Sequence, residues 1–151
     1  MTFIDCDTEP NVSSPLVLKM HQKQGMLKWN RKVQGNSIFL ASCQTVDDIM
    51  GAAVYQEILS KNIPVLNANV LDYLLANPHD IPEEWKAPTF GMVFFWGTIY
   101  GLKSVSKPQK PYRLVRGLYR NTRQDSEWTS SPFNIDQCAW DTCMTAAVHA
   151  S

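Results

Sequence analysis

Acidic residues are absent from the segment between Lys86 and Gln124, which carries eight basic residues and nearly half of the chain's aromatic residues. The whole chain has 14 basic and 14 acidic residues, so its formal net charge is zero. A cationic and aromatic segment can bind an acidic partner, but a neutral chain lacks the excess positive charge of dedicated nucleic-acid-binding domains. Basic residues on the rim of a half-buried sheet would have the same composition, so both interpretations stay open.

Long apolar runs and a targeting signal are also absent. The longest stretch without a charged residue, Ala87 to Leu102, has sixteen residues and includes three glycines, whereas a membrane-spanning helix needs ~20 apolar residues. Asp5, Asp7 and Glu9 stand near the N-terminus, where a signal peptide would carry positive charge followed by an apolar run. We therefore expect a cytoplasmic protein that does not contact a membrane.

Cysteines are few, and the known catalytic signatures are missing. Four cysteines in a chain of 151 residues without a secretory signal favour reduced thiols. Cys138 and Cys143 are spaced too widely for a usual zinc-binding pair, and no second pair follows, so no metal is predicted. The chain has no glycine-rich phosphate loop, serine nucleophile elbow or metalloprotease helix. The sequence therefore predicts no cofactor, and it favours a non-catalytic role without excluding an enzyme.

The apolar pattern predicts an α+β fold, in which one amphipathic helix and one short helix pack on a mostly antiparallel sheet. Residues 1–14 lack apolar periodicity and are predicted to form a loosely ordered N-terminal arm, followed by a single α+β domain over residues 15–151. Cys138–His149 is compatible with a short helix or a closing strand. The predicted strands are Pro15–Met20, Met26–Val33, Ser37–Cys43 and Thr89–Tyr100.

Two helices are predicted in the middle of the chain. Apolar residues recur at helical spacing over Val46–Ser60, where Thr45 and Asp48 have the form of a capping box. A second, shorter helix is predicted over Val70–Ala76, behind an Asn69 cap.

The segment Tyr112–Arg120 can be read as a strand or as a helix, and the choice decides where its arginines lie. A strand places Arg116 and Arg120 on one face and Arg113 on the other. A helix would bring all three to one face. Gly117 disfavours a helix, and the β-branched and aromatic residues suit a sheet, so we predict a strand.

A distinctive sequence runs from Pro64 to Tyr100. It contains the runs Val65–Leu75 (VLNANVLDYLL), Ile81–Trp85 (IPEEW) and Phe94–Tyr100 (FFWGTIY). This stretch, about a quarter of the chain, resembles a group of small uncharacterised bacterial proteins, and the likeness continues over Leu114–Tyr119. The resemblance implies a bacterial or phage origin and a strand after Pro111. It implies no catalytic or binding residue, because no activity is assigned to that group.

The basic and aromatic region from Lys103 to Arg123 carries the main functional prediction, a non-catalytic binding module that engages an acidic partner, either protein or nucleic acid. Arginine and aromatic side chains dominate many interfaces, and aromatic rings stack on unpaired bases. We expect charge reversal at Arg116 and Arg120 to abolish binding with little change in melting temperature; the oligomeric state is left open. The candidate binding residues are Trp96, Lys107, Lys110, Tyr112, Arg113, Arg116, Tyr119, Arg120 and Arg123.

Two alternative functions stay open. The first is a cysteine-dependent enzyme, because Cys43 precedes a predicted helix N-terminus, which favours the nucleophilic thiolate. His21 or His79 would act as its base, and Asp47 or Asp48 would orient that base. The second is a phage or mobile-element accessory protein that inhibits a host nucleic-acid machine by the same binding chemistry.

Overall fold

The computed structural model describes residues 2–44, 49–86, 91–103, 113–121, 127–136, 138–140 and 143–150. These residues form an α+β fold with mostly antiparallel strands, so the predicted fold class is confirmed. The helices are α1 (Arg31–Gln34), α2 (Gly51–Ser60) and α3 (Ala68–Ala76), and the 3-10 turns are η1 (Pro78–Asp80) and η2 (Glu83–Lys86). The strands are β1 (Thr2–Asp5), β2 (Leu16–His21), β3 (Met26–Trp29), β4 (Ile38–Phe39), β5 (Ile49–Met50), β6 (Met92–Phe94), β7 (Thr98–Leu102), β8 (Leu114–Asn121), β9 (Glu127–Asn134), β10 (Cys138–Trp140) and β11 (Met144–Ala147).

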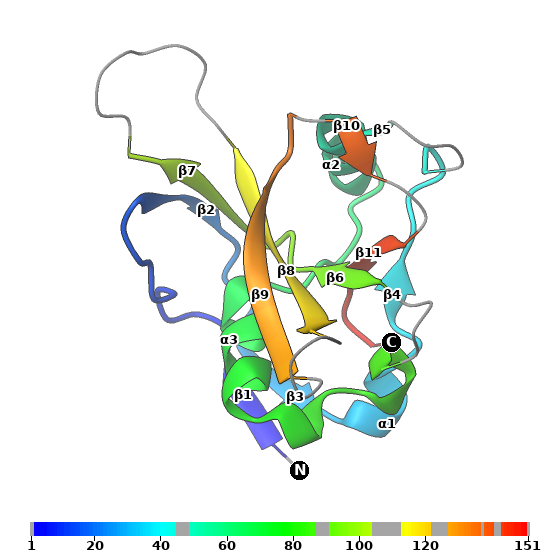
Figure 1. The fold of residues 1–151 in the computed structure, drawn as a ribbon. Helices are drawn as coiled ribbons and strands as arrows, with labels where there is room; N and C mark the ends of the chain where they lie inside the picture. Colours follow the sequence, from blue (N-terminus) through cyan, green and yellow to red (C-terminus); the bar gives the residue numbers. More distant parts are fainter. Residues whose placement is uncertain are drawn as a thin grey trace.

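Within the described residues, a seven-stranded sheet organises the fold (Figure 1). Its strand order is β2-β7-β8-β6-β11-β4, and β9 pairs with β8 outside this path. The β6–β11 pair is parallel, and the other pairs of this sheet are antiparallel. Two pairs of strands form separate two-stranded ribbons that are not part of this sheet. In Figure 1 the β1–β3 ribbon lies with α1 and α3 at the lower end, and the β5–β10 ribbon lies with α2 at the upper right.

β8 is the central strand, and the predicted strand after Pro111 is confirmed over Leu114–Arg120. One edge of β8 pairs with β9 along its whole length. The other edge is shared, because it pairs with β7 at Leu114 and with β6 at Gly117 and Leu118. The sheet therefore has two arms on that side of β8: β7 continues to β2, and β6 continues to β11 and β4.

The two arms separate at a turn over Phe95–Gly97, so the prediction of one continuous strand over Thr89–Tyr100 is wrong. Residues 89 and 90 lie outside the described residues. Glycine permits the turn, because a Cβ at Gly97 would lie 2.9 Å from the Cα and the amide nitrogen of Asn67. The Gly97 amide also donates a hydrogen bond to the carbonyl of Leu66 at 2.9 Å. The turn is therefore packed directly against the chain that enters α3.

Asn67 is fully buried and caps α3. Its Oδ1 accepts a hydrogen bond from the Asn69 amide at 3.1 Å. Its Nδ2 donates to the carbonyls of Cys6 and Gln22 at 2.9 and 2.8 Å. The helix therefore starts at Ala68 behind an Asn67 cap, earlier than the predicted start at Val70 behind Asn69, because the side chain at 67 satisfies a free amide of the first turn.

α2 begins at Gly51 rather than at the predicted Val46, because Ile49–Met50 form β5. The predicted capping box lies at 45–48, outside the described residues. A Cβ at position 51 would lie 2.6 Å from the indole Nε1 of Trp140. The first residue of α2 therefore has to be small for the helix to approach β10.

Two apolar clusters cover opposite faces of the sheet, since neighbouring residues such as Val93 and Phe94 point to different clusters. The cluster on the α3 side includes Ile4, Trp29, Leu71, Leu74, Trp85, Val93, Phe95 and Leu118. The cluster on the α2 side includes Val54, Ile58, Phe94, Trp96, Ile99, Val115, Ile135 and Trp140.

The N-terminal residues belong to the first of these clusters. β1 pairs with β3 in an antiparallel register, and Ile4 and Cys6 are 5% and 0% exposed. The structure therefore differs from the predicted loose arm over residues 2–6, because alternate residues of this short, polar segment are buried under α3.

Three other predicted segments are only partly correct. Met26–Val33 is a strand only as far as Trp29 and then continues into α1. Ser37–Cys43 is a strand only at Ile38–Phe39. Cys138–His149 contains β10 and β11, which settles the choice in favour of strands. Among the described residues, no helix is both long and apolar enough to span a bilayer.

We expect Asn67→Ala to lower the free energy of unfolding by about 2–4 kcal/mol, because it removes a helix cap and the hydrogen bonds to the buried Cys6 carbonyl and the half-buried Gln22 carbonyl. Urea denaturation measures the loss. The matched control is Asn30→Ala, which removes only the exposed cap of α1 and is expected to cost about 1 kcal/mol or less. Equal losses in the two variants would contradict the role given to Asn67.

Candidate functional site

The three described arginines of the Lys103–Arg123 region do not share one surface. Arg113 stands just before β8, and Arg116 and Arg120 lie on it. The alternation of a strand separates Arg113 from the other two, as predicted. Each of the three has different surroundings, so these described arginines do not form a single basic patch.

Arg116 is part of the fold. Its Nη2 lies 2.9 Å from Oδ1 of Asp72 on α3 and donates to Oγ of Ser130 on β9 at 3.1 Å. Only 15% of the Arg116 side chain and 34% of the Asp72 side chain are exposed. The ion pair therefore joins α3 to the sheet. We therefore expect charge reversal at Arg116 to lower the melting temperature, in contrast to the expectation from the sequence.

Arg120 is exposed, and its charge acts on Glu83 in the η2 turn. The pKa of Glu83 is lowered, first by its hydrogen bond and charge interaction with Lys86 and then by the charges of Arg31 and Arg120. Arg120 therefore belongs to a mixed-charge surface around η2, away from Arg113.

The aromatic candidates are also placed differently from the prediction. Trp96 is 1% exposed and stacks on Tyr55, with ring centroids 5.5 Å apart. Its predicted role as a surface anchor is therefore wrong, because the turn at Phe95–Gly97 directs it into the core. Tyr119 is half-buried, and its hydroxyl lies 3.0 Å from Oγ of Ser131. Four further candidates, Lys107, Lys110, Tyr112 and Arg123, lie outside the described residues.

Two exposed lysines stand on one face of the β2–β7 arm. Lys19 lies on β2, and Lys103 follows the end of β7. The Lys19 side chain crosses Gly101, since a Cβ there would lie 2.6 Å from the Lys19 Cε. The Lys103 amide donates a hydrogen bond to the Pro15 carbonyl at 2.8 Å, which continues the pairing of β2 and β7 by one residue. Because residues two apart on an extended strand share a face, we infer that Lys103 lies on the same face as Gly101 and Lys19. Among the described residues, neither lysine forms an ion pair.

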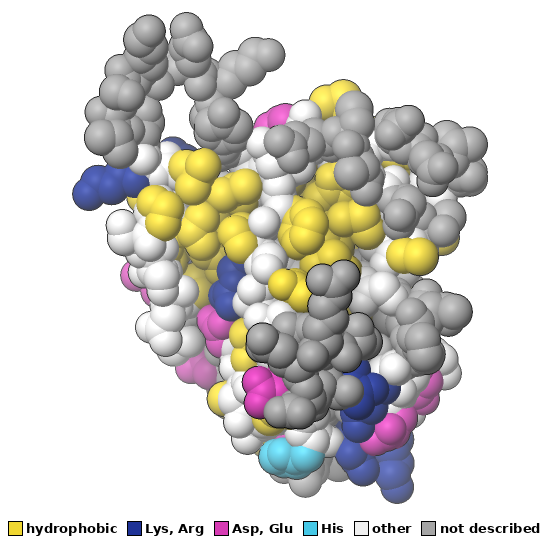
Figure 2. Space-filling view, in the orientation of Figure 1, with side chains coloured by type: hydrophobic (Ala, Val, Ile, Leu, Met, Phe, Trp, Pro, Cys, Tyr) yellow, Lys and Arg dark blue, Asp and Glu magenta, His cyan; other side chains and the backbone are white. Residues whose placement is uncertain are grey.

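Arg113 completes this face, because the register of β7 and β8 places it beside Gly101. Its Nη2 lies 2.7 Å from Oδ1 of Asp136, and the hydrogen bond to that carboxylate raises the pKa of Arg113. Asp136 therefore balances one of three positive charges. In Figure 2 basic side chains project at the upper left, where Figure 1 places the end of β7. We name this surface the β7 cationic face, defined by Lys19, Lys103 and Arg113.

Cys43 does not occupy the position that the enzyme alternative requires. It is half-buried against the cluster on the α2 side, and α2 starts only at Gly51. His21, one of its predicted bases, has its Nδ1 2.7 Å from Oγ1 of Thr98. His79 lies in η1, and Asp47 and Asp48 are outside the described residues. Within the described part of the chain, no contact joins a base to this thiol.

The other described thiol in the core is Cys6. Burial first, and then the charges of Asp5 and Asp7, raise its pKa to about 11. Cys6 is therefore a protonated core residue at neutral pH. Within the described residues, no group of three or more His, Cys, Asp or Glu side chains could hold a metal ion.

Lys19 was not among the binding residues predicted from the sequence. Lys19 and Lys103 are far apart in the chain, and only the pairing of β2 with β7 brings them together. Two signals were present in the sequence: Lys19 stands in a predicted strand, and Gly101 leaves room beside it.

No family model, curated protein or solved structure matches this chain. The assignment of a site therefore depends on the geometry of the molecule.

We expect Arg116→Met to lower the free energy of unfolding by about 1–3 kcal/mol, because it leaves the Asp72 carboxylate without its partner in a half-buried position. Lys103→Met removes an exposed cation with no described ion pair and is expected to cost less than about 0.5 kcal/mol. Thermal and urea unfolding of both variants provide the comparison. An Arg116→Met protein as stable as Lys103→Met would show that the ion pair does not support the fold.

Proposed function

We propose that the protein is a non-catalytic binding module that engages an acidic protein partner through the β7 cationic face. The observation that supports this proposal most directly is the position of Lys19 and Lys103. Both ammonium groups are exposed on one face, and no described carboxylate neutralises them. Unpaired cations on one face raise the local positive potential, which attracts and orients an acidic surface.

The sequence of the segment that follows Lys103 supports the same surface. Residues 104–112 follow Lys103 directly and carry Lys107, Lys110 and Tyr112. Their structure lies outside the described residues, but their sequence adds two cations and an aromatic residue to the segment between β7 and β8. The proposed contact region therefore differs from the predicted one: it keeps residues 103–113 and gains Lys19. It leaves out the predicted residues Trp96, Arg116, Tyr119, Arg120 and Arg123.

Burial of the aromatic residues favours a protein over a nucleic acid as partner. Binding of single strands uses exposed rings on which bases stack. Among the described residues, the two rings that precede Lys103 in the sequence, Trp96 and Tyr100, are each 1% exposed, and Tyr119, which follows Arg113, is half-buried. Tyr55, which interacts with Arg113, is half-buried and stacked on Trp96. An acidic protein surface needs only the cations, so it fits these residues better.

We expect the double variant Lys19→Glu/Lys103→Glu to weaken binding of poly-glutamate, an acidic polypeptide probe, about tenfold at physiological ionic strength. The matched control is Lys23→Glu/Lys28→Glu, which makes the same charge change at two exposed lysines elsewhere. Its expected effect is less than about twofold, because separate surface charges are screened beyond ~8 Å. Fluorescence anisotropy with labelled poly-glutamate measures both affinities.

Equal losses of affinity in the two double variants would show that binding depends only on net charge, which would contradict a defined site. Unchanged binding in Lys19→Glu/Lys103→Glu would exclude the β7 cationic face as the binding site. Labelled oligothymidylate is the comparison ligand. If it binds more tightly than poly-glutamate and depends on the same lysines, the partner is a nucleic acid and not an acidic protein.

A further inference from the structure

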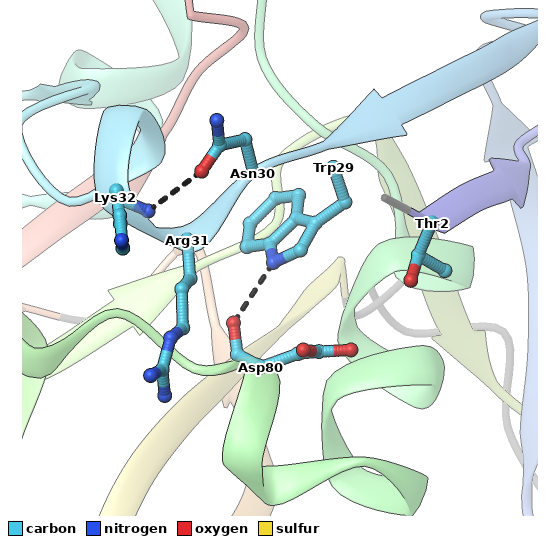
Figure 3. Close-up of a pocket in the computed structure, with 6 residues that line it drawn as sticks. All are labelled: Thr2, Trp29, Asn30, Arg31, Lys32 and Asp80. Atoms are coloured by element: carbon cyan, nitrogen blue, oxygen red, sulfur yellow. Dashed lines mark hydrogen bonds between the residues drawn. The ribbon is translucent and has the colours of Figure 1, made fainter.

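A pocket of about 350 Å³ opens where β1, β3 and α1 meet η1, at the opposite end of the molecule from the β7 cationic face (Figures 1 and 3). Its volume falls in the range of sites that hold small molecules. Its lining combines both signs of charge with one aromatic ring. The lining residues are Thr2, Trp29, Asn30, Arg31, Lys32 and Asp80.

One side of the pocket carries two cations. Arg31 and Lys32 begin α1, and Oδ1 of Asn30 fixes this start by accepting a hydrogen bond from the Lys32 amide at 3.0 Å. Nη1 of Arg31 donates to the carbonyl of His79 at 2.7 Å, which ties the guanidinium to η1. Lys32 is exposed, and no described residue forms an ion pair with it.

The other side carries a carboxylate that neighbouring residues hold in place. Oδ2 of Asp80 accepts a hydrogen bond from the Tyr73 hydroxyl, and only 21% of the Asp80 side chain is exposed. The backbone carbonyl of Asp80 accepts a hydrogen bond from Nε1 of Trp29 at 2.8 Å. In Figure 3 the Asp80 carboxylate points toward Thr2, while Arg31 and Lys32 lie on the far side of the Trp29 indole.

The opposite charges of this pocket do not neutralise each other. Asp80 has an ion-pair distance only to His79, at 3.7 Å, and Arg31 has one only to Glu83, at 4.0 Å, among the described residues. The indole of Trp29 lies between the two sides and is itself 3% exposed, so it forms a rigid base. A simple anion would be repelled by Asp80, and a simple cation would be repelled by Arg31 and Lys32.

We propose that this pocket binds a small zwitterion, with its carboxylate at Arg31 and Lys32 and its ammonium group at Asp80 and the Thr2 hydroxyl. The carbon chain between the two charges lies across the edge of the Trp29 indole. Each end of such a ligand forms a charge-assisted hydrogen bond, and each of the two charged sides gains an oppositely charged group of the ligand. This site is separate from the β7 cationic face and does not depend on the function proposed for that face.

A graded series of probes tests the proposal on the full chain. Glycine, γ-aminobutyrate and ε-aminocaproate carry the same two charges at increasing separations, and butyrate and butylamine carry only one of them. Titrations follow the indole N–H signal of Trp29 by NMR, assigned by its loss in Trp29→Phe. We expect at least one of the two longer zwitterions to produce a saturable shift of this signal, with affinity at least about fivefold above that of butyrate and butylamine.

Two substitutions test where each charge of the ligand binds. Lys32→Met and Asp80→Asn are each expected to lower the affinity for the zwitterion about fivefold. The control Lys28→Met, which changes an exposed lysine outside the lining, is expected to lower it less than about twofold. Asp80→Asn could perturb the fold because the Asp80 carboxylate accepts a hydrogen bond from the Tyr73 hydroxyl. In that case Lys32→Met alone still tests the proposal. The proposal is overturned if no zwitterion produces a saturable shift, if butyrate binds as tightly as γ-aminobutyrate and ε-aminocaproate, or if Lys28→Met weakens binding as much as Lys32→Met.

Discussion

The close approach of the Phe95–Gly97 turn to the chain entering α3 is the constraint on which the rest of the structure depends. The Gly97 and Ala68 amides donate hydrogen bonds to the Leu66 carbonyl and to Oγ1 of Thr98, each at 2.9 Å, and no side chain larger than that of glycine fits at position 97. Thr98 and Asn67 are both fully buried, so their polar groups depend on partners within the protein. Oγ1 of Thr98 contacts the Ala68 amide and the His21 ring, and the Asn67 side chain bonds the Asn69 amide and the carbonyls of Cys6 and Gln22. This contact ends β6, starts β7 and fixes the first turn of α3 at the same place.

The division of the sheet decides what each cation can do. Because β6 and β7 share one edge of β8, Arg116 lies near the junction, where Asp72 of α3 comes within 2.9 Å of it. The β2–β7 arm extends away from that junction, with Lys103 beyond the end of β7 and the Lys19 side chain reaching across Gly101 toward that end. One basic segment of the sequence thus supplies a structural ion pair at the junction and exposed charge at the end of the arm.

Local patterns predicted the parts of the fold that depend on neighbouring residues. Gly117, together with Val115 and the tyrosines near it, correctly indicated a strand, and the pattern over Val70–Ala76 correctly indicated a helix. The turn at Phe95–Gly97 was missed because its cause is the approach of Asn67, about 30 residues earlier, and a local pattern does not contain that contact. The candidate site was missed in part for the same reason: Lys19 joins Lys103 only through strand pairing, and Trp96 is buried only because the chain turns there.

The central claim is that the exposed charge at the end of the β2–β7 arm, and not the arginines along β8, receives the partner. Amide hydrogen exchange measured by mass spectrometry, with and without bound poly-glutamate, tests this claim most directly. The account predicts slower exchange over residues 16–21 and 98–103, with little change over 116–121. Slower exchange confined to 116–121 and β9, or to the pocket residues 29–32, would contradict it.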